Sequence, residues 1–239
     1  MGFVTPAVLP SSRVELEEKL ALFARIPKVS RIQIDVVDGK FATPASWPYT
    51  AQKELEAMVR KGEMLPHLDR IGYEIDLMCL NAERSAADWL ALGATRIVFH
   101  VESTTDISRL CASACKRFGA GDGFAPGLIS FGLALNIATD LALLEPCLGE
   151  IEFVQFMGIA QIGRQGQPLD RRIFDKVHTF RTSHPEIPVQ VDGGVTLANA
   201  REFTALGVTN FVVGSGILRA ADPVKAFAAF EELENPYGV

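Results

Sequence analysis

Residues 189–195 read VQVDGGV, an apolar alternation that ends in an acidic residue and two glycines. The alternation predicts a buried strand, and a carboxylate at the end of such a strand, Asp192, is costly unless it is partnered or used in chemistry. Gly193 and Gly194 allow a ligand close to the backbone, and the helical pattern from Leu197 offers free N–H groups to an anion. Asp192 is therefore a candidate for chemistry and the two glycines for phosphate binding. A strand that ends in a tight turn capped by the aspartate is the simpler alternative.

Short apolar runs alternate with amphipathic helical patterns along the whole chain. This alternation predicts a parallel sheet, and eight such pairs close most naturally into one (β/α)8, or TIM, barrel with its active site at the strand carboxyl ends. One domain of residues 1–239 is expected, because no change in composition marks a boundary. An open doubly wound sheet is the alternative, disfavoured because no Gly-x-Gly-x-x-Gly follows the first strand. Strands are expected at residues 3–9, 31–37, 71–78, 95–100, 132–136, 152–159, 189–192 and 210–215, and helices at 14–26, 51–61, 81–92, 106–118, 139–147, 171–182, 197–206 and 223–233.

Two connections differ from plain linkers. Residues 38–50 form a long segment rich in glycine, proline and aromatic residues, and this length predicts a functional lid. Residues 119–127 are rich in glycine and are predicted to be a flexible insertion between a helix and the next strand. In a wound α/β fold, that position lies on the face away from the active site.

The composition argues against several classes of protein. The net charge of −6 and the pI near 5.3, without a basic block, argue against a nucleic-acid surface. The N-terminus lacks the pattern of a secretory signal, and no apolar run reaches the ~18 residues of a membrane helix. The four cysteines show no convincing disulfide or zinc spacing. We therefore predict a cytoplasmic protein whose partner is a small molecule, not nucleic acid or a membrane.

Polar side chains recur at the predicted strand ends, and a barrel brings them to one mouth. Asp35 lies near the end of the second strand and Asp192 at the end of the seventh, and these two strands are expected to lie across the barrel from each other. Two opposed carboxylates suit removal of a proton from one face of a carbon and delivery to the other. Asp35 could instead cap a helix or pair with an arginine, and Asp76 is either a metal ligand or a structural partner. His100 is expected to be a satisfied core histidine, because a single histidine makes no zinc site.

The ends of the seventh and eighth strands match the phosphate position common in such barrels. Gly193-Gly194 and Gly214-Ser215 lie there, which predicts a phosphorylated small molecule as the ligand. Other strand-end side chains are candidates for contact with the substrate, with core packing the alternative for the two methionines. These candidates are Gln33, Met78, Asn136 and Met157.

Six motifs follow one another in the order of a known family: IDVVDGKF (34–41), DLM (76–78), GLALN (132–136), GRQGQ (163–167), VDGG (191–194) and VGS (213–215). On these motifs the chain resembles the ribulose-phosphate 3-epimerase family over nearly its whole length. The resemblance implies a TIM barrel of the ribulose-phosphate-binding type, and an epimerase acting at C3 of D-ribulose 5-phosphate or a related ketose phosphate. It further implies that Asp35 and Asp192 exchange the proton and that Gly166 joins the phosphate glycines. A divalent metal, commonly zinc, and a homo-oligomer are also implied.

The chain departs from this family at the metal site. The two metal-binding histidines of the family correspond here to Gln33 and Asp76. Zinc favours nitrogen and sulfur ligands, whereas an all-oxygen set suits magnesium or manganese. Such an all-oxygen set is formed by Gln33, Asp35, Asp76 and Asp192, so we hypothesise either a harder metal or none. Without a cation, one carboxylate should be protonated or paired with a cationic side chain, for which Arg164 is a candidate.

Two further functions stay open from the sequence. One is a different sugar-phosphate lyase or isomerase, because one fold hosts many chemistries. The other is a phosphosugar-binding protein that has lost catalysis together with the two histidines.

Overall fold

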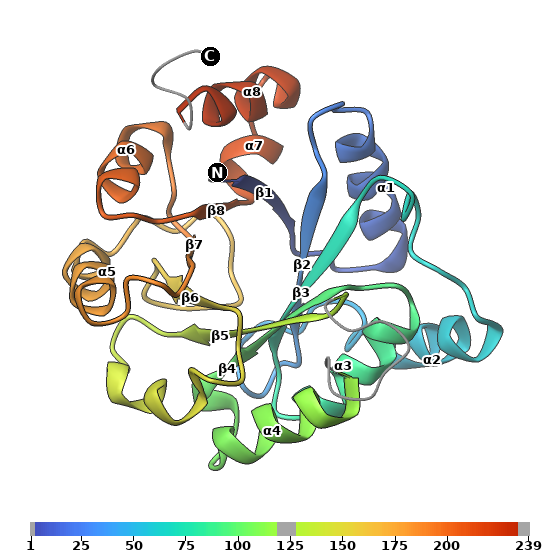
Figure 1. Ribbon diagram of the computed structural model, residues 1–239. Helices are drawn as coiled ribbons and strands as arrows, with labels where there is room; N and C mark the ends of the chain where they lie inside the picture. The colour runs from blue at the N-terminus through green and yellow to red at the C-terminus, as the bar shows by residue number, and fades with distance from the viewer. Residues whose placement is uncertain (1–2, 119–127, 234–239) are drawn as a thin grey trace.

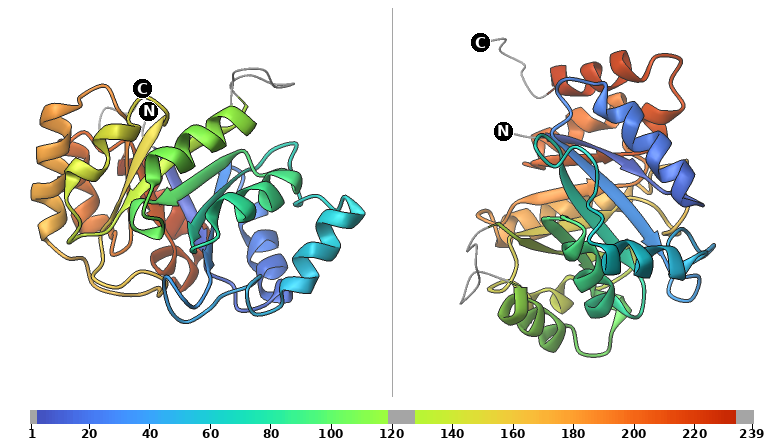
Figure 2. Two further views of the ribbon diagram at one scale, coloured as in Figure 1. Left: turned by 90° about the horizontal axis from the view of Figure 1, so that it is seen from below. Right: turned by 90° about the vertical axis from the view of Figure 1, so that its right-hand side faces the viewer.

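The computed structural model describes residues 3–118 and 128–233, and its eight strands form a closed barrel. Neighbouring strands pair in parallel in chain order, and the barrel closes where β1 (Phe3–Val8) pairs with β8 (Asn210–Val213). Figure 1 shows the helices in a ring around the strands, and Figure 2 shows the same arrangement from two further sides. The predicted TIM barrel is confirmed. The other strands are β2 (Arg31–Val37), β3 (Gly72–Met78), β4 (Arg96–His100), β5 (Ser130–Leu135), β6 (Phe153–Met157) and β7 (Val189–Asp192).

The helices that surround the barrel are, among the described residues, α1 (Arg13–Ala24), α2 (Gln52–Lys61), α3 (Ala82–Ala91), α4 (Ile107–Phe118), α5 (Arg172–Ser183), α6 (Leu197–Ala205), α7 (Ser215–Leu218) and α8 (Pro223–Leu233). Local capping explains where two of them begin. The Ser12 hydroxyl accepts the N–H of Glu15 at 3.2 Å before α1, and Thr196 and Asn199 form a capping box before α6. No helix among these is long and apolar enough to cross a bilayer.

The connection after β5 differs from the prediction. A continuous helix was expected at residues 139–147, but the structure forms two 3-10 turns, η2 (Leu141–Leu143) and η3 (Glu145–Cys147). Pro146 has no N–H to donate to the preceding turn, so it prevents a continuous α-helical hydrogen-bond ladder. Asp140 caps the first turn, with its Oδ1 accepting the N–H of Ala142 at 2.9 Å. A further 3-10 turn, η1 (Val101–Ser103), follows β4.

The two unusual connections have different outcomes. Residues 38–50 are described throughout and pack against the barrel: Trp47 is fully buried and meets Trp89 edge-on at 5.8 Å. No residue of 38–50 lines the pocket of about 460 Å³ at the strand ends, so a lid role stays a prediction. The predicted insertion at 119–127 lies outside the described residues, and the single domain of residues 1–239 likewise stays a prediction.

The barrel interior is polar at mid-height, whereas the layer between strands and helices is apolar. Typical barrels of this kind fill their interior with branched aliphatic side chains. Here, however, buried polar side chains from six strands meet inside the barrel: Thr5, Gln33, Glu74, Gln155, Gln190 and Asn210. Because side chains two residues apart in a strand share a face, Gln33, Glu74 and Gln190 lie one layer beneath the aspartates that follow them. The interior therefore supports the acidic strand ends directly.

Candidate active site

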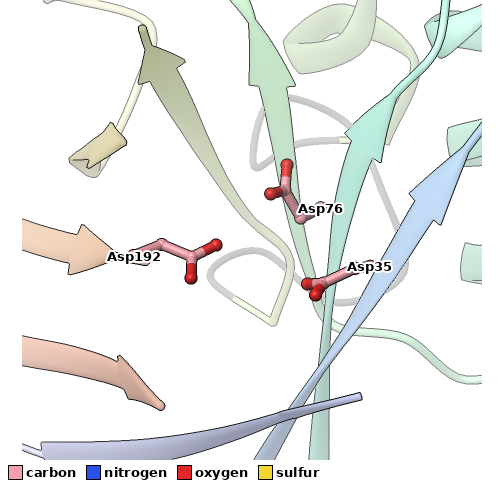
Figure 3. Close-up of side chains that lie close together, drawn as sticks. All are labelled: Asp35, Asp76 and Asp192. Carbon is pink, nitrogen blue, oxygen red and sulfur yellow. The ribbon is translucent and has the colours of Figure 1, made fainter. Parts of the chain in front are cut away.

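Three aspartates converge at the carboxyl ends of the strands. Asp35 on β2 pairs in register with Asp76 on β3, and Asp192 is the last residue of β7. One oxygen of each carboxylate lies within 4.8 Å of the others. Figure 3 shows the three side chains pointing toward one another. β2 and β7 lie three places apart around the closed ring of eight strands, one place short of the directly opposite position that was predicted. The carboxylates still meet, because all three point into the barrel.

Two buried amides bridge the carboxylates. Gln33 Nε2 donates to Asp35 Oδ1 at 2.9 Å and to Asp192 Oδ2 at 3.0 Å. Gln155 Nε2 donates to Asp76 Oδ2 at 3.1 Å and to Asp192 Oδ2 at 3.4 Å. Each amide thus ties two aspartates together, and Asp192 receives a hydrogen bond from both. The sequence places Gln155 among the polar residues of the strand ends, two residues before Met157 and so on the same inward face, but sequence reasoning gave it no role.

His100, on β4, is the histidine partner of the cluster. His100 Nε2 lies 2.8 Å from Asp76 Oδ1, and both side chains are fully buried. Burial alone would lower the pKa of His100, but the negative charge of Asp76, with Glu102 and Asp35 beyond it, raises that pKa above its usual value. His100 is buried, as expected for a core histidine, and its Nε2 has a hydrogen-bond partner in Asp76, a residue of the site. Arg164, the candidate suggested by the sequence, instead donates from Nε to the carbonyl oxygen of Thr43 at 3.1 Å.

Burial and mutual repulsion raise the pKa of both aspartates that line the pocket. Burial first, and then the charge of Asp76, raises the pKa of Asp35 to about 7. Burial first, and then the charges of Asp35 and Asp76, raises the pKa of Asp192 well above its usual value. The hydrogen bond from Gln33 opposes the rise in each case. Two coupled carboxyls with raised pKa values are suited to share one proton, and one protonated and one ionised carboxyl is the state needed for acid–base chemistry.

A pocket of about 460 Å³ opens above this pair. Asp35 and Asp192 lie in its wall, and the side chains of Met78 and Met157 lie beside them. The phosphate candidates of the sequence also line it: Gly166, Gly193, Gly194, Gly214 and Ser215. Three other sequence candidates, Gln33, Asp76 and Asn136, do not line this pocket.

The first two of these lie beneath the pocket, and the third belongs to a neighbouring cluster. Gln33 and Asp76 are fully buried, so they act on a bound molecule only through the groups above them. Asn136 follows β5, where its backbone N–H donates to Glu102 Oε1 at 2.8 Å and its carbonyl oxygen accepts from Lys176 Nζ at 2.5 Å.

The glycine turn after β7 is held against β6 with no room for a side chain. Gly193 and Gly194 have φ of +91° and +70°, a region that L side chains rarely adopt. A Cβ on Gly158 would lie 2.3 Å from the carbonyl oxygen of Gly193. The N–H of Gly158 also donates to the carbonyl oxygen of Asp192 at 2.6 Å. Gly158 is therefore a residue of the site that sequence reasoning missed.

The aspartate cluster could hold a divalent cation. Its three carboxylates offer only oxygen ligands, the ligand type that hard cations such as magnesium prefer. Gln33 does not extend this set, because its NH2 group faces the carboxylates and its Oε1 points down to Gln190. Three carboxylates therefore fit a cation, and the fourth oxygen ligand expected from the sequence is turned away.

Comparison with known proteins agrees with this geometry. A model of the ribulose-phosphate 3 epimerase family matches residues 3–218. The ribulose-phosphate 3-epimerase of Aquifex aeolicus (strain VF5) is 27% identical over 195 residues, which cover 80% of this chain and 78% of that protein. The chloroplastic ribulose-5-phosphate-3-epimerase of Arabidopsis thaliana is 26% identical over 242 residues, which cover 99% of this chain and 78% of that protein.

Solved structures of other enzymes share the fold. A 3-hexulose-6-phosphate synthase from Salmonella typhimurium aligns with a TM-score of 0.66 at 15% identity over 98% of each chain. A KGPDC from Streptococcus mutans, solved as a complex with a ligand, aligns with a TM-score of 0.69 at 16% identity, again over 98% of each chain. At this identity the likeness shows the fold alone.

Proposed function

The chain belongs to the ribulose-phosphate 3-epimerase family, and we propose that it epimerises a ketose phosphate at C3 by proton transfer through Asp35 and Asp192. The observation that most supports this proposal is the placement of both carboxyls in the wall of one pocket of about 460 Å³. The proton that the pair retains near neutral pH gives it one acid and one base. D-Ribulose 5-phosphate is the first substrate to test, because the family and its named relatives act on it.

The proposed reaction needs one base and one acid on opposite faces of C3. The ionised aspartate takes the proton from C3, and the electron pair of the broken C–H bond moves onto the neighbouring carbonyl to give an enediolate. The protonated aspartate then delivers its proton to the other face of C3. Return of the electron pair restores the carbonyl, so the two carboxyls exchange roles for the reverse reaction.

The remaining pocket residues suit the other parts of such a substrate. The glycine turn at 193–194 and the start of α7 at Gly214-Ser215 offer backbone N–H groups to a phosphate, with Gly166 on the facing loop. Met78 and Met157 make the wall beside the carboxyls apolar, which excludes water from the enediolate. Binding of a sugar phosphate is further supported by the ribulose-phosphate 3 epimerase family model, which matches residues 3–218.

We also propose that any cation in the aspartate cluster is magnesium or manganese, because its protein ligands would all be oxygens. When bound, such a cation supplies positive charge for the oxygen of the enediolate. The carboxylates of Asp35, Asp76 and Asp192 would hold it. A homo-oligomer follows from the family resemblance alone, and sedimentation of the purified chain tests it.

Incubation with D-ribulose 5-phosphate in D2O tests the proposed function. Deuterium at C3 and formation of the C3 epimer are expected in the wild type. Asp35→Asn and Asp192→Asn should each lower epimerisation on the order of 10²–10⁴-fold, which is the usual share of one acid–base group. A matched control is Asp222→Asn, because the side chain of Asp222 is 44% exposed and pairs with the exposed Lys225 at 3.5 Å outside the pocket lining.

Other outcomes point to the alternatives. Release of formaldehyde or carbon dioxide from another sugar phosphate, without epimerisation of this one, would identify a lyase. Binding of D-ribulose 5-phosphate without exchange at C3 would identify a binding protein. Full epimerase activity in either aspartate variant would refute the assigned roles.

A further inference from the structure

The polar interior of the barrel begins at an ion pair whose charges are fixed. Arg96 Nε donates to Glu74 Oε2 at 2.6 Å, and the guanidinium also lies 3.8 Å from the centre of the Phe153 ring. An arginine has only donors and keeps its proton in proteins. Glu74 is therefore held as a carboxylate, and both of its oxygens accept hydrogen bonds.

The carboxylate of Glu74 decides which way the amide of Gln190 points. The two ends of a glutamine amide have to be assigned from their partners. The Gln190 end that faces Glu74 Oε1, at 2.7 Å, must be the NH2 group, because a carboxylate oxygen cannot donate. The other end, Oε1, then accepts from Asn210 Nδ2 at 2.5 Å, which is consistent.

The NH2 group of Gln190 in turn orients two further amides. It lies 2.5 Å from the side-chain oxygen of Gln155 and 3.3 Å from that of Gln33. An NH2 group has two hydrogens, and the two shorter contacts, to Glu74 and Gln155, use both, so the group on Gln155 must be Oε1. The contact to Gln33 is a longer third one, and Oε1 is favoured there because two NH2 groups would repel each other. The NH2 groups of Gln33 and Gln155 are thereby left to face the aspartates. Each hydrogen-bond direction follows from the one before it, starting at Arg96.

We propose that Glu74 and Gln190 are positioning residues that turn two amide N–H donors toward the acid–base pair, in a site that lacks the family's histidines. This inference rests on the proposed function for its catalytic consequence. If the chain of hydrogen bonds were reversed, Oε1 of Gln33 would face Asp35 and Asp192. The lone pairs of that oxygen would then repel the carboxylate oxygens of both aspartates. The carboxyls would leave the positions in which Gln33 Nε2 now bridges them at 2.9 and 3.0 Å.

The direct test is the orientation of the amides, read by neutron diffraction from crystals of the deuterated wild-type protein. Nitrogen and oxygen scatter neutrons differently, and deuterium atoms are seen. We expect the ND2 groups of Gln33 and Gln155 to face the aspartates and that of Gln190 to face Glu74. An Oε1 of Gln33 or Gln155 directed at an aspartate would overturn the proposal. This readout needs neither a variant nor a known substrate.

The functional test exchanges the two ends of one hydrogen bond. Glu74→Gln combined with Gln190→Glu conserves the total charge, keeps an acceptor for Arg96 and keeps a hydrogen bond between positions 74 and 190. The carboxylate at 190 now requires donors from Gln33 and Gln155, so both amides should turn over. We expect kcat on D-ribulose 5-phosphate to fall on the order of 10²-fold, as for an ångström-scale misplacement of catalytic groups. KM should stay within twofold, because neither position lines the pocket.

A matched control keeps the shape of the side chain and removes a different interior hydrogen bond. Thr5 Oγ1 donates to Asn210 Oδ1 at 3.2 Å, on the far side of Gln190. Thr5→Val should leave kcat within threefold of the wild type. A folded exchange variant with wild-type kcat, or with only KM altered, would overturn the positioning role. If the wild type itself does not epimerise D-ribulose 5-phosphate, the proposed function fails, and the neutron experiment still decides the amide orientation.

Discussion

Gly158→Ala should damage phosphate-ester binding although residue 158 is not in the pocket lining. A Cβ on Gly158 would lie 2.3 Å from the carbonyl oxygen of Gly193, and real Cβ atoms essentially never approach closer than 3.0 Å. The glycine turn must therefore move by about 0.7 Å. The obstacle is backbone, so no side chain can rotate away. A shift of this size would misplace the N–H groups proposed to hold the phosphate.

The expected loss follows from this displacement. An ångström-scale misplacement costs on the order of 10²-fold, or about 3 kcal/mol at 1.4 kcal/mol per tenfold change. We expect KM for D-ribulose 5-phosphate to rise by about this factor. A smaller fall in kcat should accompany it, because the N–H of Gly158 donates to the carbonyl oxygen of Asp192. Steady-state kinetics give both constants, and calorimetry with inorganic phosphate gives a Kd that does not depend on turnover.

The matched control is Gly149→Ala, since a Cβ on Gly149 meets nothing within 4 Å. Both variants lose the same freedom in the unfolded chain, so their difference reports the collision alone. Thermal unfolding shows whether Gly158→Ala is folded at the assay temperature. A folded Gly158→Ala protein with wild-type KM and wild-type phosphate Kd would refute the assignment of the glycine turn to the phosphate.

Three further predictions concern pH, metal and packing. The pKa of Asp35 is raised to about 7 in the folded chain, whereas in the unfolded chain it is about 4. Between these two pH values the folded chain keeps a proton that the unfolded chain has released. The free energy of unfolding therefore falls as the pH rises from about 4 to about 7. Asp35→Asn should therefore resist urea better than the wild type at pH 8, and lose that advantage at pH 4; an equal advantage at both would contradict the raised pKa. Asp76→Asn should weaken manganese binding at least tenfold by calorimetry, whereas unchanged affinity would place the metal elsewhere. Phe203→Ala, which removes a buried ring stacked 4.4 Å from Phe174, should cost about 3–5 kcal/mol in urea unfolding, and Leu197→Ala, at an exposed position, should cost far less.

The fold was predictable because its signals are local. The apolar run at residues 31–37 predicted β2 with its observed bounds. The connection after β5 was not predicted correctly, because apolar residues at helical spacing outweighed the effect of Pro146. Asp35 and Asp192 were recognisable because each carboxylate stands at or near the carboxyl end of an apolar strand.

The interior network was not predictable from the same signals. Gln155 and Gln190 each stand in an apolar strand, and a single polar residue there does not reveal its partner. Their meeting depends on barrel closure and on the stagger between strands, which bring residues from β3, β6 and β7 to one height. His100 was left as a core histidine for the same reason, since its contact with Asp76 joins two strands and no spacing in the sequence encodes it.

The most direct test of a two-carboxylate mechanism is the stereochemistry of exchange in the single variants. Each C3 epimer of the ketose phosphate is incubated in D2O with Asp35→Asn and with Asp192→Asn, and deuterium at C3 is measured by mass spectrometry. If the carboxyls serve opposite faces of C3, each variant should exchange the hydrogen of one epimer only, and the two variants should act on different epimers without interconverting them. Exchange of the same epimer by both variants would contradict this account. The hydrogen on that face of C3 would then be removed without Asp35 and also without Asp192, so neither carboxyl would be the required base for that face.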